Sequence, residues 1–125
     1  MQVLQIKPLE AVHVDQDRLG ALYSQLGEAG AEDVVCRALE ELAMRLSHCE
    51  QLFRDGAWAD LRKNSRSLIA IAEQVGMSAL SQVARDVTLC IDRGDTTAVA
   101  ATLSRLIRVG ERSLMLVWDI QDFTI

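Results

Sequence analysis

Apolar residues recur along this chain at alternating steps of three and four, which is the spacing of one face of an α-helix. Four segments carry such a stripe, over about residues 31–54, 57–75, 77–93 and from 96 to beyond 116. The first two stripes consist of Val35, Leu39, Leu42, Leu46, Cys49 and Phe53, and of Trp58, Leu61, Ser65, Leu68, Ala72 and Val75. Stripes this narrow are typical of helices that pack in a bundle.

Glycine residues mark the ends of these segments. Asp55-Gly56 follows the first helix, Gly76 the second and Gly94 the third, and glycine tolerates the left-handed conformation that closes a helix. Asp95 is then a favourable N-terminal cap for the last helix. The connections between the four helices are therefore expected to be very short.

The two ends of the chain are less regular. Residues 1–14 are compatible with a strand or with an arm that docks on the bundle. A short helix is predicted to begin near Asp15, which can cap it, and to end at the break from Gly27 to Gly30. The tail, residues 119–125, is expected to fray or to be packed by Phe123.

Helices of this length joined by very short turns must pack antiparallel with their neighbours. We therefore predict one all-α domain over residues 1–125, an up-down-up-down four-helix bundle with an additional short N-terminal helix at one end. Because every helix carries an apolar stripe, the pattern also leaves open that one helix pairs with a second copy of the chain.

The composition narrows the classes of partner. The chain is 50% hydrophobic and has a net charge of −5, which argues against nucleic acid, whose phosphates need clustered basic residues. Apolar runs stay short of the ~20 residues of a bilayer span, and the N-terminus lacks the pattern of a signal peptide. We expect a cytoplasmic protein whose three cysteines, Cys36, Cys49 and Cys90, are buried free thiols.

Residue patterns for catalysis are missing from the sequence. There is no Gly-x-x-x-x-Gly-Lys loop for nucleotides and no Glu-x-x-His pattern of a di-iron bundle. His48 is turned away from its apolar stripe and is expected to be exposed, and His13 lies in the N-terminal arm. We therefore predict no enzymatic activity, no cofactor and no metal site.

Residues 58–80 resemble the central helix and following turn of histidine-containing phosphotransfer (HPt) domains. In that family the phosphorylated histidine is followed by Leu two residues on, a small residue at six, Gly at ten and an apolar residue at fourteen. Aligned on Gly76, this chain has Leu68, Ala72 and Leu80 at the matching positions. The resemblance covers about residues 14–114, and the segment from Arg54 to Leu61 is similar to the hairpin that leads into the histidine helix.

The residues of the HPt pattern that take part in phosphotransfer are replaced in this chain. Arg66 stands in the place of the histidine, and a guanidinium has no nucleophilic nitrogen at accessible pH. The family's Lys and Gly at three and four, and its small polar residue at five, are replaced by Ile69, Ala70 and Ile71. Shifting the alignment does not bring a histidine to the position of Arg66, since no histidine follows His48 in the chain.

The resemblance therefore implies a signalling protein that binds a receiver domain or a histidine kinase without carrying phosphate on the usual histidine. A receiver domain presents acidic side chains around its phosphoacceptor, and basic residues on the corresponding helix are complementary to them. The residues predicted to bind the partner are Arg62, Lys63, Arg66, Ile69, Ala70 and Gln74. Two alternatives stay open: an active phosphotransfer protein that uses His48 or His13, and a helical adaptor unrelated to phosphorelays.

Overall fold

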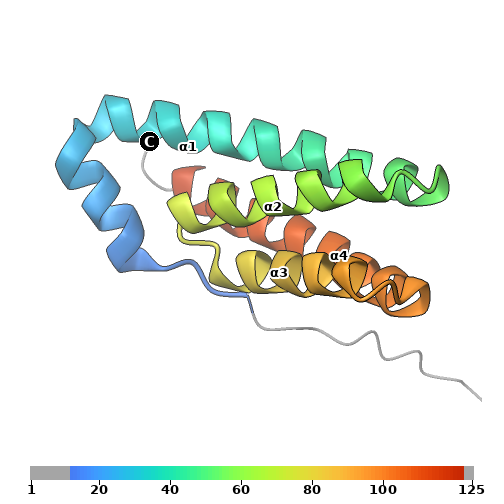
Figure 1. Cartoon of the computed structure of the whole chain (residues 1–125). Helices are drawn as coiled ribbons and strands as arrows, with labels where there is room; N and C mark the ends of the chain where they lie inside the picture. The colour runs from blue at the N-terminus through green and yellow to red at the C-terminus, as the bar shows by residue number, and fades with distance from the viewer. Residues whose placement is uncertain (1–11, 123–125) are drawn as a thin grey trace, which may run out of the picture.

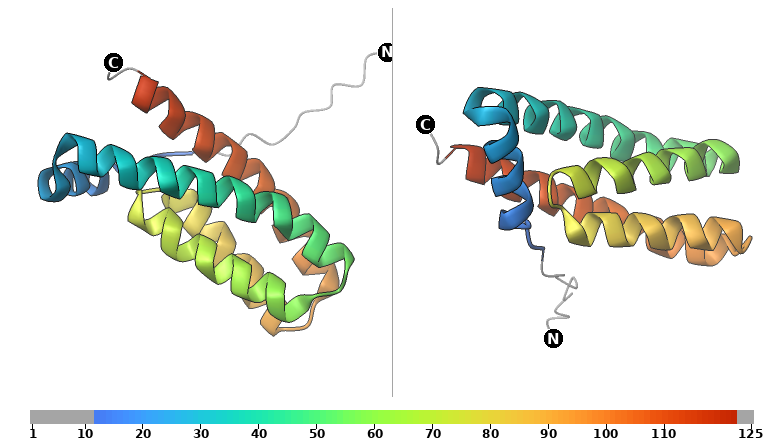
Figure 2. Two further views of the ribbon diagram at one scale, coloured as in Figure 1. Left: turned by 90° about the horizontal axis from the view of Figure 1, so that it is seen from above. Right: turned by 60° about the vertical axis from the view of Figure 1, so that its left-hand side comes forward.

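The described part of the chain, residues 12–122 of a computed structural model, is built from four helices (Figure 1). They are α1 (Gln16–Arg54), α2 (Trp58–Gln74), α3 (Ser78–Asp92) and α4 (Thr96–Asp122). Successive helices run in opposite directions, and α4 returns to lie beside α1 (Figure 2). The helices α2 and α4 occupy diagonal positions, and no Cα atoms of the two lie within 8 Å of each other. The predicted all-α four-helix bundle is therefore confirmed.

The helix ends lie close to the predicted ones because local chemistry determines them. The carboxylate of Asp15 accepts a hydrogen bond from the backbone N–H of Arg18 at 3.1 Å, and that of Asp95 accepts one from Ala98 at 3.1 Å. Helix α2 ends at Gln74, and Gly76 follows it with a φ of +75°. Only glycine adopts this left-handed conformation without steric penalty.

The predicted separate N-terminal helix is not seen. Residues 16–26 are helical, but they form the first part of α1, which continues to Arg54 across a kink at Gly27 (φ 74°, ψ 171°). The break falls where the sequence predicted it, yet the helix resumes immediately, so no loop separates two elements. We call residues 16–26 the α1 arm; it is bent across one end of the bundle (Figures 1 and 2).

The α1 arm is attached to the turn between α2 and α3. Val14 forms an isolated antiparallel bridge with Met77, and the backbone N–H of Asp15 donates to the carbonyl of Gly76 at 2.8 Å. Arg18 Nε donates to the carbonyl of Glu73 at 3.1 Å. The short described part of the predicted N-terminal arm therefore docks on the bundle.

Two sequence expectations fall partly outside the described residues. Residues 1–11 of the predicted N-terminal arm and Phe123 in the predicted tail are not among them. Residues 119–122, which were assigned to the tail, belong to α4.

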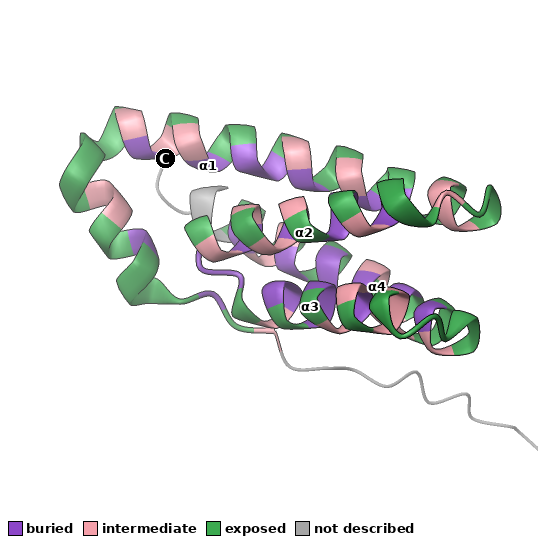
Figure 3. Cartoon of the chain, in the orientation of Figure 1, coloured by how far each residue is buried: buried purple, intermediate pink, exposed green. Residues whose placement is uncertain are grey.

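The core lies between all four helices, where the buried residues, purple in Figure 3, face one another. Its largest fully buried side chains include Leu42 of α1, Leu61 and Leu68 of α2, Leu80 of α3 and Leu106 of α4. Leu42, Leu61 and Leu68 belong to the two apolar stripes whose members are named above, and Leu80 and Leu106 lie within the other two predicted helical segments.

Some members of the predicted stripes lie at the edge of the core. Phe53 is half-buried and Trp58 is 37% exposed, and their rings pack edge to face at 5.5 Å where α1 meets α2. The three cysteines are free, but only Cys49 is buried, whereas Cys90 is half-buried and Cys36 is exposed. The expectation of a buried Cys36 is wrong because its neighbour Val35 takes the core position, and adjacent helical residues point about 100° apart.

The N-terminus of α2 lacks a side-chain cap. Ala57 occupies the N-cap position and makes no side-chain hydrogen bond, so backbone N–H groups of the first turn have no side-chain acceptor there. We expect Ala57→Asp to raise the free energy of unfolding by about 1 kcal/mol, measured by urea denaturation. Ala59→Asp places the same charge in the first turn without the cap geometry and should stabilise less. Equal effects of the two substitutions would contradict a capping role.

Candidate docking face on α2

The orientation of α2 is determined by its inward residues. Leu61, Leu68 and Ala72 are fully buried, and they recur at helical spacing toward the core. Two polar residues, Asn64 and Ser65, are also buried on this inner side. The opposite side of α2 must therefore face solvent.

Buried hydrogen bonds hold α2 in this orientation. Asn64 Nδ2 donates to the carbonyl of Arg45 at 2.8 Å and to Cys49 Sγ at 3.1 Å, while Arg45 Nη1 donates to Asn64 Oδ1 at 3.0 Å. On the other flank, the hydroxyls of Ser65 and Thr88 are 2.8 Å apart. These contacts tie α2 to α1 and to α3, so its outer face is positioned from both sides.

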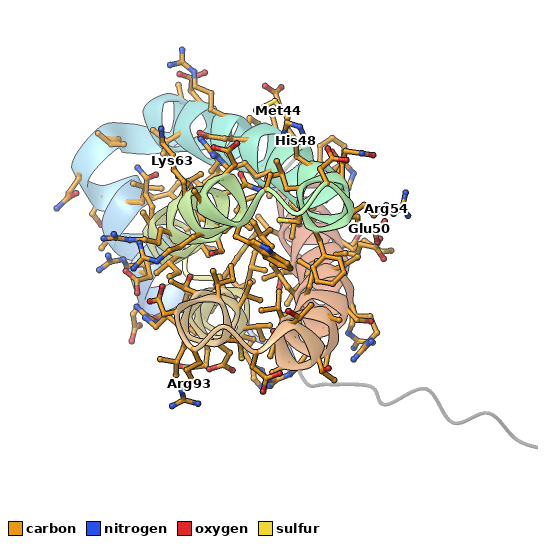
Figure 4. All side chains as sticks on the ribbon, turned by 45° about the vertical axis from the view of Figure 1, so that its right-hand side comes forward. Met44, His48, Glu50, Arg54, Lys63 and Arg93 are labelled. Carbon is orange, nitrogen blue, oxygen red and sulfur yellow. The ribbon has the colours of Figure 1, made fainter. Side chains whose placement is uncertain are left out.

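Four of the six predicted partner-binding residues lie on the outer face of α2. They are Lys63, Arg66, Ala70 and Gln74, which are all exposed and follow one another at steps of three, four and four. Lys63 projects away from the bundle in Figure 4. Arg66 is exposed in the middle of α2, and Gly76 follows the end of that helix, as the sequence predicted. We call these four residues the α2 face.

Arg62 lies beside the α2 face but is already paired. Its Nε and Nη2 donate to the two carboxylate oxygens of Asp92 on α3 at 2.6 and 3.2 Å. This hydrogen-bonded pair lowers the pKa of Asp92 and raises that of Arg62, and the charge of Arg66 adds to the lowering at Asp92. Within residues 12–122, neither Lys63 nor Arg66 takes part in an ion pair, so these two supply the available positive charge of the face.

Ile69 contributes less to the face than expected. It is half-buried and packs against the core, on the flank of α2 that faces α3. The exposed apolar surface that was predicted from Ile69 and Ala70 together is therefore reduced mainly to the methyl group of Ala70. The α2 face is more polar than the sequence indicated.

A cleft adjoins the α2 face at its C-terminal end. It has a volume of about 470 Å³ and lies between the α1 arm and α2. Ala70 and Gln74 line it from α2, and Arg18, Leu22 and Gln25 line it from the α1 arm. No binding role was predicted for Arg18, Leu22 or Gln25, because the approach of the arm to α2 is a contact between distant residues that local spacing does not encode.

Outside α2, the residues that could accept phosphate or bind a metal ion do not gather in one place. His48 is exposed on the outer side of α1, as predicted (Figure 4). His13 is exposed before that helix. Within the described range, no three His, Cys, Asp or Glu residues are grouped so that they could hold a metal ion. The described helices also include none with the length and apolarity of a membrane span.

Known proteins give no further guidance to the role of the α2 face. No protein-family model, no curated protein and no solved structure matches this chain.

Proposed function

We propose that this chain binds a receiver domain or a histidine kinase through the α2 face and does not carry phosphate there. The observation that carries the proposal is the position of Arg66, which is exposed in the middle of a bundle helix, at the place that the HPt resemblance gives to the phosphorylated histidine. Of the two partners, the available charges of Lys63 and Arg66 favour the receiver domain, whose phosphoacceptor is surrounded by acidic side chains.

The chemistry of Arg66 explains why binding would not lead to transfer. An arginine guanidinium stays protonated and only donates hydrogen bonds, so it can occupy an acidic pocket but cannot attack a phosphoryl group. Its planar group of donors fits a carboxylate or phosphate well. The protein would therefore act by occupancy, as an inhibitor or a scaffold.

The docking test reverses the charge of the face. We expect Lys63→Glu combined with Arg66→Glu to lower the association rate with receiver domains of the same cell by about tenfold or more at low salt, since exposed charges mainly control encounter. Binding is measured by surface plasmon resonance at two salt concentrations. The matched control is Arg37→Glu combined with Arg108→Glu, which changes the net charge equally on α1 and α4. Undiminished binding of the α2 variant would exclude this face.

The same proteins test the absence of transfer. After incubation with a phosphorylated receiver domain, we expect no acid-labile phosphate on this chain. Acid-labile label that disappears in His48→Gln would instead identify an active phosphotransfer protein that uses the exposed histidine of α1.

A further inference from the structure

Helix α4 exposes two large apolar side chains next to each other. Met115 is 67% exposed and Trp118 is 60% exposed, and they are three residues apart on the same side of the helix. A single exposed apolar residue is ordinary, whereas a group of them beside a depression is typical of a binding surface.

The depression lies between α1 and α4. It has a volume of about 390 Å³, and its apolar wall consists of Leu39, Ala43, Leu114, Met115 and Trp118. We call it the α1–α4 hollow.

The α1–α4 hollow lies next to a close contact between the two helices. A Cβ atom added to Gly110 would lie 2.5 Å from Cδ1 of Leu46, so α1 and α4 pack against each other at this glycine. The hollow begins beyond this contact, toward the C-terminus of α4. The same surface thus presents protruding apolar groups and a concave apolar region.

Two opposite charges border the apolar group on α4. Arg112 and Asp119 are exposed, and no ion pair of either is found within residues 12–122. They are seven residues apart, two helical turns, and therefore lie along one side of α4 with Met115 between them. If two such helices pair antiparallel about a two-fold axis near Met115, Arg112 of each faces Asp119 of the other.

We propose that the Met115–Trp118 surface of α4 binds a second copy of this chain in a symmetric antiparallel pair. Met115 and Trp118 of each copy would cover the α1–α4 hollow of the other, and Arg112 would pair with Asp119 twice. Arg112 and Asp119 make the surface self-complementary in charge, as a two-fold interface requires. Because α2 and α4 are diagonal in the bundle, this proposal is independent of the α2 face.

The first test measures the self-association of the full chain by sedimentation velocity over a range of concentrations. We expect a monomer–dimer equilibrium that Met115→Glu weakens by about tenfold or more, since a charge would be buried at the centre of the interface. The matched control is Met44→Glu: Met44 is 60% exposed, but it lies on the outer side of α1 and does not line the hollow (Figure 4).

The second test is a charge exchange. We expect Arg112→Glu to weaken the dimer, and the combination of Arg112→Glu with Asp119→Arg to restore it, because both pairs are then present in reversed order. If two substitutions in the same chain restore the dimer, positions 112 and 119 must meet across an interface between two copies of that chain. A dimer that persists unchanged in Met115→Glu would place the interface elsewhere and overturn the proposal.

A chain that is monomeric at every concentration would also overturn it, and Trp118 then reports what covers the hollow. In Trp58→Phe, which keeps an aromatic ring against Phe53, Trp118 is the single tryptophan. Fluorescence emission and iodide quenching typical of an exposed indole would show that the surface is uncovered in the monomer, and the partner of this surface would then be a different protein. A shielded indole in the monomer would indicate that the ends of the chain itself cover it.

Discussion

Replacing Gly76 by alanine is expected to lower the free energy of unfolding by about 2–5 kcal/mol. Gly76 has a φ of +75°, which is unfavourable for any residue with a Cβ atom. The added Cβ would also lie 2.9 Å from the carbonyl oxygen and 3.1 Å from Cβ of Asp15. This backbone cannot move away without breaking the 2.8 Å hydrogen bond from Asp15 N–H to the Gly76 carbonyl.

Gly94 provides a matched control for this prediction. It has a φ of +68°, but an added Cβ would meet nothing within 4 Å. Gly94→Ala should therefore show only the conformational penalty, about 1–2 kcal/mol. Urea denaturation of both variants measures the difference, which is the contribution of the close approach of Asp15. Equal losses would contradict tight packing between the start of α1 and the turn after α2.

The position of Gly76 connects stability with the candidate site. The turn that contains it holds the α1 arm through Val14 and Asp15, and the arm forms one wall of the cleft beside Ala70 and Gln74. A substitution that pushes Asp15 away would therefore also change the surface that adjoins the α2 face. Tests of binding should use variants such as Lys63→Glu and Arg66→Glu, whose side chains are exposed and leave this turn intact.

The helices could be predicted from the sequence because local patterns encode them. The apolar stripe through Leu61, Leu68 and Ala72 predicts which side of α2 is buried, and it follows that Lys63, Arg66, Ala70 and Gln74 are exposed. The turns could be predicted for the same reason, since a glycine or a capping aspartate acts on its immediate neighbours.

Contacts between distant residues could not be predicted in this way. Arg62 pairs with Asp92, thirty residues away, and Arg18 contacts Glu73, fifty-five residues away. Neither contact follows from periodicity, and the first removes Arg62 from the available charges of the predicted face. The continuity of α1 was missed because Gly27 was read as the end of a helix, whereas one residue with non-helical angles produces only a kink.

The second large effect is a loss of stability at alkaline pH, which should arise from one buried thiol. Cys49 is fully buried, and this burial raises its pKa from the ordinary value of 9.0 to about 11. The hydrogen bond from Asn64 Nδ2 to the sulfur, at 3.1 Å, and the nearby charge of Arg45 favour the thiolate but only partly offset the burial.

The direction of the pH effect follows from proton linkage. Above pH 9 the thiol of the unfolded chain loses its proton, whereas the folded protein keeps the proton on Cys49 up to about pH 11. The unfolded state then binds fewer protons than the folded state, so stability falls as the pH rises. At about 1.4 kcal/mol per pH unit, roughly 2 kcal/mol of the stability present below pH 9 should be lost by pH 11, where about half of the folded molecules still keep the proton on Cys49.

Substitution of single cysteines separates this effect from other alkaline titrations. We expect the free energy of unfolding, measured by urea denaturation between pH 7 and pH 11, to fall less steeply in Cys49→Ala than in the natural sequence. Cys36→Ala removes an exposed thiol instead and should keep the steep fall. Every other side chain is identical in the three proteins, so the comparison isolates the substituted thiol. Equal slopes in the three proteins would mean that water reaches Cys49 in the folded state, and the buried network of Asn64, Arg45 and Cys49 would then not hold α2 closely against α1.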